Sequence, residues 1–99
     1  MQAIDIEIFC ESWREFDGEA KGFILCNQIE AFIIHLASKD FCELIMFRRR
    51  IINKAEVRRK FIADLDVPTF RNFKNLMFYD ILLALIKAKC KYKIGRAHV

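Results

Sequence analysis

Residues 17–28 place oxygen-bearing side chains at spacings that a calcium ion could use. In a twelve-residue calcium-binding loop, oxygen ligands at positions 1, 3 and 5 and a bidentate glutamate at position 12 surround the ion. With Asp17 at position 1, Glu19 occupies position 3, Lys21 position 5 and Gln28 position 12. A lysine therefore stands where an anion is needed, and a neutral amide replaces the bidentate carboxylate. We expect this degenerate loop to hold no metal ion.

The backbone signature of such a loop is nevertheless kept. Gly22 stands at position 6, where the sharp turn requires glycine, and Ile24 supplies an apolar side chain at position 8. A second stretch, with Leu76 at position 8, lacks ligands more completely. Its positions 1, 3, 5, 6 and 12 are Thr69, Arg71, Phe73, Lys74 and Asp80. Both loops are therefore predicted to keep the shape of a calcium loop without its ligands.

Other kinds of site find little support in the sequence. No nucleophile–base pair, glycine-rich phosphate loop or metal-binding box is visible, so we expect no enzyme and no cofactor. His35, beside Leu36 in a predicted helix, is interpreted as a packed or surface histidine and not as a base. The cysteines form no C-x-x-C pair and are expected to be reduced thiols. Zinc binding is the alternative, although the two histidines show no ligand spacing with Cys10, Cys26, Cys42 and Cys90.

Two predicted helices flank the first loop. In the first, apolar side chains recur at i, i+3, i+7 and i+10 and define one face, and Asp17-Gly18 ends the helix. That face is formed by Ile6, Phe9, Trp13 and Phe16. The helical period returns after the loop at Ile29, Phe32, Ile33 and Leu36.

Two more predicted helices flank the second loop. The third begins at a variant capping box, Asn53 with Glu56, and ends near Leu65–Asp66, because Pro68 cannot lie inside a helix. The fourth begins at Phe78 and becomes basic toward its end, as the helix dipole favours.

These elements predict an all-α fold of two paired helix–loop–helix units, the EF-hand arrangement, with four main helices. The extended pieces around Ile24 and Leu76 are expected to pair as a short two-stranded β-ladder between the loops. We place one domain at residues 1–93. Within it lie a first hand at about 4–38, a connector at 39–52 and a second hand at about 53–93.

Charge is divided between the two halves of the chain. Residues 1–47 carry a net charge of −6 and residues 48–99 one of +10, which together give the overall +4. Such a dipolar domain favours an acidic partner or anionic lipid for its basic half, and no nucleic-acid-binding motif surrounds the basic residues. The connector at 39–52 is expected to contain a helical turn, with a solvated loop at Arg48–Arg50. The wider basic patch comprises Arg48, Arg49, Arg50, Arg58 and Arg59.

The last six residues, Ile94–Val99, match the translation of ATC GGA AGA GCA CAC GTC, and the next codon of that DNA is TGA. That DNA is similar to a widely used sequencing-library adapter. We therefore expect residues 94–99 to be a non-native tail on a fragment of a longer open reading frame, with Met1 an internal methionine.

Four segments carry a resemblance to a known family. They are W-x-x-F-D-x-x-A-x-G-x-I (Trp13–Ile24), Asn53-Lys54, L-D-V-P (Leu65–Pro68) and F-Y-D-I-L-L-A-L-I-K (Phe78–Lys87). In order and spacing they resemble the cytoplasmic EF-hand-like domain of voltage-gated calcium and sodium channel α-subunits, across residues 6–90. The connector SKDFCELIMFRRRII departs from the pattern, because that family usually has prolines there.

The resemblance implies a non-catalytic regulatory module at the cytoplasmic face of a membrane, as part of an integral membrane channel. Its implied roles are channel gating and partner docking. The implied partners are other cytoplasmic segments of the parent channel, and calmodulin through an IQ helix beyond Lys93. The alternative is a free-standing, calcium-independent adaptor that binds an amphipathic helix.

In both readings, the paired hands are expected to hold an apolar groove that accepts an amphipathic helix. The expected lining of that groove is drawn from Phe9, Trp13, Phe32, Leu36, Phe61 and Leu82, and some members of this set are expected to fill the core instead.

Overall fold

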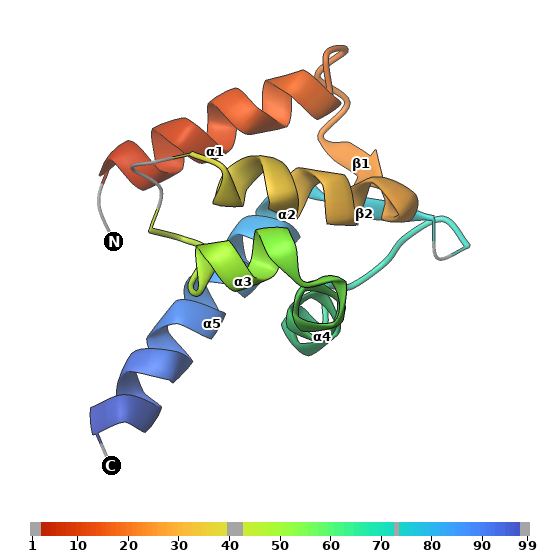
Figure 1. Cartoon of the computed structure of the whole chain (residues 1–99). Coiled ribbons are helices and arrows are strands. Elements are labelled where there is room, and N and C mark those ends of the chain that lie inside the picture. Colours follow the sequence, from red (N-terminus) through yellow and green to blue (C-terminus); the bar gives the residue numbers. More distant parts are fainter. Residues whose placement is uncertain (1–2, 40–42, 73, 98–99) are drawn as a thin grey trace.

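The computed structural model describes residues 3–39, 43–72 and 74–97, with side chains placed up to Lys91. Within these ranges the chain is mostly helical and forms five α-helices, one short 3₁₀ helix and two short strands (Figure 1). In chain order they are α1 (Ala3–Phe16), β1 (Phe23–Leu25), η1 (Cys26–Gln28), α2 (Ile29–Ala37), α3 (Arg48–Asn53), α4 (Ala55–Leu65), β2 (Asn75–Met77) and α5 (Phe78–Ala97). The expectations about Cys42, Phe73 and the side chains of residues 94–99 fall outside these ranges.

A two-stranded antiparallel sheet joins the two loops, which confirms the predicted ladder. β1 pairs with β2 so that Ile24 lies opposite Leu76, and both side chains are buried. The pairing continues beyond the strands, because the backbone N–H of Phe78 donates to the carbonyl of Gly22 at 2.9 Å. Gly22 has a φ of 86°, a left-handed value that glycine adopts without a steric penalty.

Helix α2 is central to the packing and contacts α1, α3 and α4. In Figure 1, α1 runs along one side of α2, and α5 leads away from the ladder toward the C-terminus. The core beneath α1 is aromatic. Edge-to-face pairs link Phe9 and Trp13 to Phe32 and Phe78, with ring centroids 5.0–5.5 Å apart, a favourable geometry for aromatic rings.

The buried face of α1 differs from the predicted one by its first member. Ile6 is 39% exposed, whereas Asp5 is fully buried. The carboxylate of Asp5 accepts a hydrogen bond from the backbone N–H of Glu43 at 2.9 Å, which offsets part of the cost of burying it. The face therefore follows the i, i+4, i+8 spacing of Asp5, Phe9 and Trp13, and the apolar Ile6 points away from it.

The connector contains a fifth helix, α3, which extends the helical turn expected there and includes the arginine triplet expected in a solvated loop. Arg48–Arg50 form its first turn, and Ile51 is buried beneath it. Asn53 is the last residue of α3 and does not cap α4; Lys54 precedes α4 and makes no side-chain capping bond. The capping-box prediction is wrong, because Asn53 belongs to the last turn of α3 and Lys54 occupies the N-cap position of α4.

The predicted end of α4 is confirmed. The helix stops at Leu65, and Asp66 then adopts the left-handed conformation with a φ of 49°, two residues before Pro68. The predicted start of α5 at Phe78 is also confirmed. Helix starts and stops marked by glycine, proline or a new apolar period are thus the ones that the sequence predicts well.

Leu85 and Leu83 of α5 allow a matched test of the core. Leu85 is fully buried, and Leu83, half a turn away, is 50% exposed. We expect Leu85→Ala to lower the free energy of unfolding by about 2–5 kcal/mol, since it leaves a cavity. Leu83→Ala should change it by about 0.5 kcal/mol or less. Urea unfolding of both variants measures the difference, and equal losses would contradict the placement of α5.

Candidate functional site

Asp17, the first residue of the candidate calcium loop, already has protein donors on both carboxylate oxygens. Its Oδ1 accepts the backbone N–H of Lys21 at 2.9 Å. Its Oδ2 accepts the backbone N–H of Gly22 at 2.8 Å and the indole N–H of Trp13 at 3.0 Å. Three donors thus surround one buried carboxylate and hold the loop in a closed turn against the end of α1.

This environment changes the acidity of Asp17. Burial alone raises its pKa, because the ionised form loses water. The N–H groups of Lys21 and Gly22, the Trp13 indole and the Lys21 charge favour the ionised form and together hold the pKa of Asp17 below its ordinary value. The carboxylate is therefore ionised at neutral pH and is satisfied within the protein.

The other two predicted ligand positions are also occupied by protein partners. The Oε1 of Gln28 accepts the backbone N–H of Leu25 at 2.9 Å, which caps η1. Glu19 lies 3.2 Å from the ammonium of Lys21 on the surface. Asp17, Glu19 and Gln28 all line one open depression of about 410 Å³, but each directs its oxygen to a donor of this chain.

The second loop is closed by its own backbone. The N–H of Phe70 donates to the carbonyl of Asn75, and the N–H groups of Asn75 and Lys74 donate to the carbonyl of Phe70, all at 3.0–3.1 Å. Arg71 and Asn72 have left-handed backbone angles at the turn, and the guanidinium of Arg71 lies over the Phe23 ring at 5.9 Å. These contacts give the second loop a structural role beside β1.

Most of the side chains predicted to line a groove are core residues. Phe9, Phe32 and Leu36 are fully buried, and Trp13 is 6% exposed. These four are therefore the members of the set that fill the core and do not line an open groove, because the apolar faces of α1 and α2 pack against each other and against Phe78.

The remaining two predicted groove residues, Phe61 and Leu82, are partly buried against the core. Phe61 lines a depression of about 490 Å³ whose other residues are Met46, Asp64, Leu65, Ala88 and Lys91. A partner-binding role for Phe61 and Leu82 stays a prediction.

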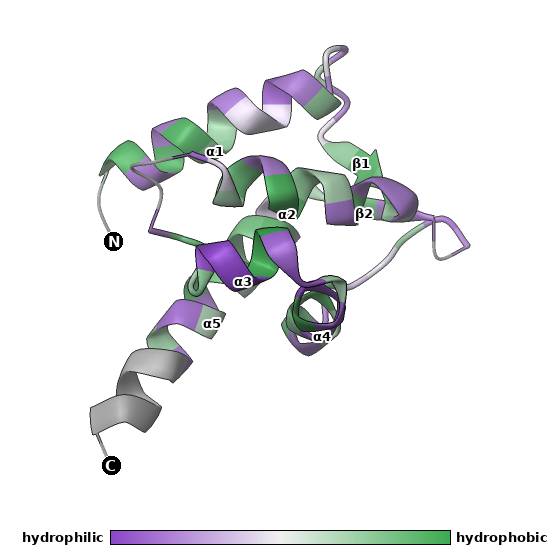
Figure 2. Cartoon of the chain, in the orientation of Figure 1, coloured by the Kyte–Doolittle hydropathy of each residue, from purple (hydrophilic) through white to green (hydrophobic). Residues whose placement is uncertain are grey.

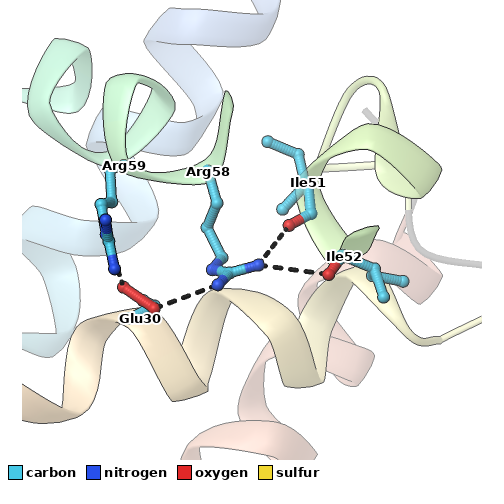
Figure 3. A network of polar contacts seen from close by, with 5 residues as sticks. All are labelled: Glu30, Ile51, Ile52, Arg58 and Arg59. Carbon is cyan, nitrogen blue, oxygen red and sulfur yellow. Dashed lines mark hydrogen bonds and ion pairs between the residues drawn. The ribbon is translucent and has the colours of Figure 1, made fainter. Parts of the chain in front are cut away.

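The predicted basic patch is divided into two groups. Arg58 and Arg59 of α4 turn toward Glu30 of α2 (Figure 3). The Nη2 of Arg58 lies 3.2 Å from Oε1 of Glu30, and the Nε of Arg59 lies 3.9 Å from Oε2. Because the side chain of Arg58 is only 11% exposed, it belongs to the contacts between helices. The Arg48–Arg50 triplet lies apart from it in α3.

Arg58 also closes the C-terminal end of α3. Its Nη1 donates to the carbonyl oxygens of Ile51 at 2.9 Å and Ile52 at 3.2 Å, as Figure 3 shows. The last carbonyls of a helix lack partners within it and carry partial negative charge, so a guanidinium suits them. One side chain of α4 thereby links α2 to α3.

Sequence reasoning missed these polar contacts for different reasons. Trp13 and Asp17 are four residues apart, a spacing that brings side chains together at the end of a helix, so that contact had a local signal. Glu30 and Arg58 are 28 residues apart in the sequence. The bond from Glu43 to Asp5 spans 38 residues, and neither long-range pair has a local signature.

The chain matches no known family model and no curated protein. Among the described residues, none of the helices combines the length and the apolar character that crossing a bilayer requires. In the same part of the chain, His, Cys, Asp and Glu side chains do not gather in threes as metal ligands would.

We expect neither loop to bind calcium tightly. Asp17 already accepts three hydrogen bonds, and Lys21 and Gln28 supply a positive charge and a neutral amide where carboxylates are needed. Calorimetric titration of the protein with calcium should reveal no site tighter than about 0.1–1 mM, the weak end of loops of this kind. A site of micromolar affinity would contradict this assignment.

The contribution of Asp17 to stability should depend on pH in a defined direction. Its pKa is lowered in the folded protein, so its stabilising effect is present above the unfolded carboxyl pKa and is lost as the pH falls through the folded value. At neutral pH we expect Asp17→Asn to lower the free energy of unfolding by about 1.5–3 kcal/mol, the range for hydrogen bonds to a charged group.

The difference between wild type and Asp17→Asn should shrink as the pH is lowered, as measured by urea unfolding across the acid range. Glu19→Gln is the matched control, because the side chain of Glu19 is 79% exposed and should contribute little at any pH. A constant difference between wild type and Asp17→Asn at every pH would exclude this role for the Asp17 charge.

Proposed function

We propose that residues 1–93 are the regulatory EF-hand-like domain of a voltage-gated cation channel α-subunit, in which two degenerate hands act through packing and not through calcium. The residues that carry the resemblance, Trp13–Ile24 and Phe78–Lys87, include the end of α1, the first two residues of β1 and the first half of α5. The proposal places this domain at the cytoplasmic face of a membrane, within a larger channel.

The observation that carries the proposal is the ladder between the loops. β1 lies between α1 and α2, β2 lies between α4 and α5, and the two strands pair through Ile24 and Leu76. Two helix–loop–helix units that share one short antiparallel ladder are the arrangement expected of paired hands. The order of elements and the central apolar pair both support it.

The closed first loop supports a calcium-independent role. In the proposed domain, Asp17 replaces an ion as the organising charge, because its carboxylate gathers the donors of Trp13, Lys21 and Gly22. The loop thus keeps its shape without metal. Regulation would come from a partner segment of the same channel that binds this domain more tightly in one gating state. Coupling of this kind is typically about 1–3 kcal/mol.

The surface best suited to such a segment is the depression that Phe61 lines. It includes the side chains of Met46, Leu65 and Ala88, and it is bordered by Asp64 and Lys91. An apolar floor with one acidic and one basic residue at its edge suits an amphipathic helix. This surface takes the place of the groove predicted around Trp13.

The experiment has two steps. The first extends the transcript upstream of residue 1, where the proposal requires a pore-lining transmembrane helix shortly before the domain. If no such helix is encoded there, the channel assignment fails and the adaptor alternative stands.

The second step records gating of the parent channel. We expect Met46→Glu, which places a charge in the depression, to shift the voltage dependence of inactivation by the equivalent of about 1–3 kcal/mol. Tyr79→Ser is the matched control, because Tyr79 is 78% exposed and does not line that depression. Gating that stays the same after deletion of residues 1–93 would refute a regulatory role.

A further inference from the structure

The surface around α3 combines positive charge with exposed apolar side chains. An open depression of about 580 Å³ lies there, and its lining includes Ile45, Phe47, Arg48, Arg49, Arg50 and Ile52. In Figure 2, α3 carries strongly hydrophilic and strongly hydrophobic stretches side by side. We call this surface the α3 face. It lies outside the calcium loops and outside the depression that Phe61 lines.

Two large apolar side chains of the α3 face are held toward solvent. Phe47 is 50% exposed and Ile52 is 36% exposed. Phe47 has a φ of 56°, in the left-handed region that is strained for a bulky residue. Strain of this kind at an exposed aromatic residue points to a role for the ring outside the core.

The arginines of the α3 face differ in their partners. The Nε of Arg48 donates to the carbonyl of Ala37 at 2.8 Å, which fixes α3 against the end of α2. Arg49 and Arg50 are exposed, and in the described part of the chain neither forms an ion pair. Their charges are therefore available to an external anion, whereas Arg58 and Arg59 share Glu30 as an ion-pair partner.

We propose that the α3 face binds the surface of an anionic lipid bilayer, with Arg49 and Arg50 at the headgroups and Phe47 and Ile52 at the boundary with the acyl chains. Arginines near an anionic leaflet are attracted to it. Exposed aromatic and aliphatic side chains lower the free energy of the bound state when they leave water for the boundary between headgroups and acyl chains. A soluble anion would use the arginines alone. The two apolar side chains therefore favour a bilayer.

This inference does not rest on the proposed channel function, because the isolated chain can be tested. The full 99-residue protein is sedimented with vesicles of phosphatidylcholine alone or with phosphatidylserine added. We expect binding only to the vesicles that contain phosphatidylserine, and release by salt, since salt screens the attraction.

Two double variants that remove equal charge distinguish binding by the α3 face from attraction by the net charge of the protein. Arg49→Ala with Arg50→Ala should weaken binding by about fivefold per arginine, or about 25-fold together. Lys60→Ala with Lys87→Ala removes the same charge from exposed positions outside this face and should keep most of the binding. If the control pair loses as much as the arginine pair, the site is refuted.

Phe47 is tested in two ways. Phe47→Gly removes the ring and suits the left-handed backbone, and we expect it to weaken vesicle binding by about tenfold. In a second variant, brominated lipid should quench the indole introduced by Phe47→Trp but not the buried Trp13. Unchanged binding by Phe47→Gly, or equally tight binding of a single-stranded oligonucleotide or of inositol hexakisphosphate, would overturn the bilayer assignment.

Discussion

The antiparallel pairing of β1 with β2 joins the two loops through the backbone, beside the contacts of α2 with α3 and α4. Its three residue pairs are extended at one end by the bond between Gly22 and Phe78, and at the other by the bond from the N–H of Cys26 to the carbonyl of Lys74 at 2.7 Å. A two-stranded ribbon alone is barely stable in water. It persists here because Ile24 and Leu76 belong to the core and because α5 begins directly after β2, with Phe78 among the rings of α1.

The first loop shows how a buried carboxylate can organise a turn. A calcium ion organises such a loop by drawing oxygens inward; here the Asp17 carboxylate draws N–H groups inward instead. The three donors occupy most of the lone pairs of this carboxylate and leave little acceptor capacity for a cation. Burial is tolerable for Asp17 because each of its oxygens has a donor. The indole of Trp13 thereby joins the loop to the aromatic core, so loop geometry and core packing depend on each other.

The basic half of the chain contains two kinds of arginine. Arg58 neutralises Glu30 and caps the end of α3, and its largely buried side chain is part of the packing between helices. Arg49 and Arg50 are exposed on the short helix that this cap helps to hold. Arg58 thus helps to hold Arg49 and Arg50 in a fixed position beside Phe47 and Ile52. The net charge of this half alone does not separate the two kinds.

The sequence by itself determined the elements that local chemistry controls. Asp17-Gly18 ends α1, α4 stops shortly before Pro68, and the apolar period starts α5 at Phe78; these signals act within a few residues, so they can be read from the chain. The alternation of helix and extended residues also led to the pairing of Ile24 with Leu76. The Trp13–Asp17 contact lies within reach of the same local reasoning, because it follows helical spacing.

Tertiary structure alone decided which apolar faces meet and which charges are satisfied. Six side chains were interpreted as a groove, yet four of them fill the core, because amphipathic periodicity marks a buried face without saying what covers it. The burial of Asp5 in place of Ile6 and the pairing of Arg58 with Glu30 cannot be read from local sequence. The partners of Asp5 and Arg58 lie 38 and 28 residues away along the chain. Asn53 ends α3 instead of capping α4. The short helix α3 is stabilised by burial of the Ile51 side chain in the core, which is a tertiary contact.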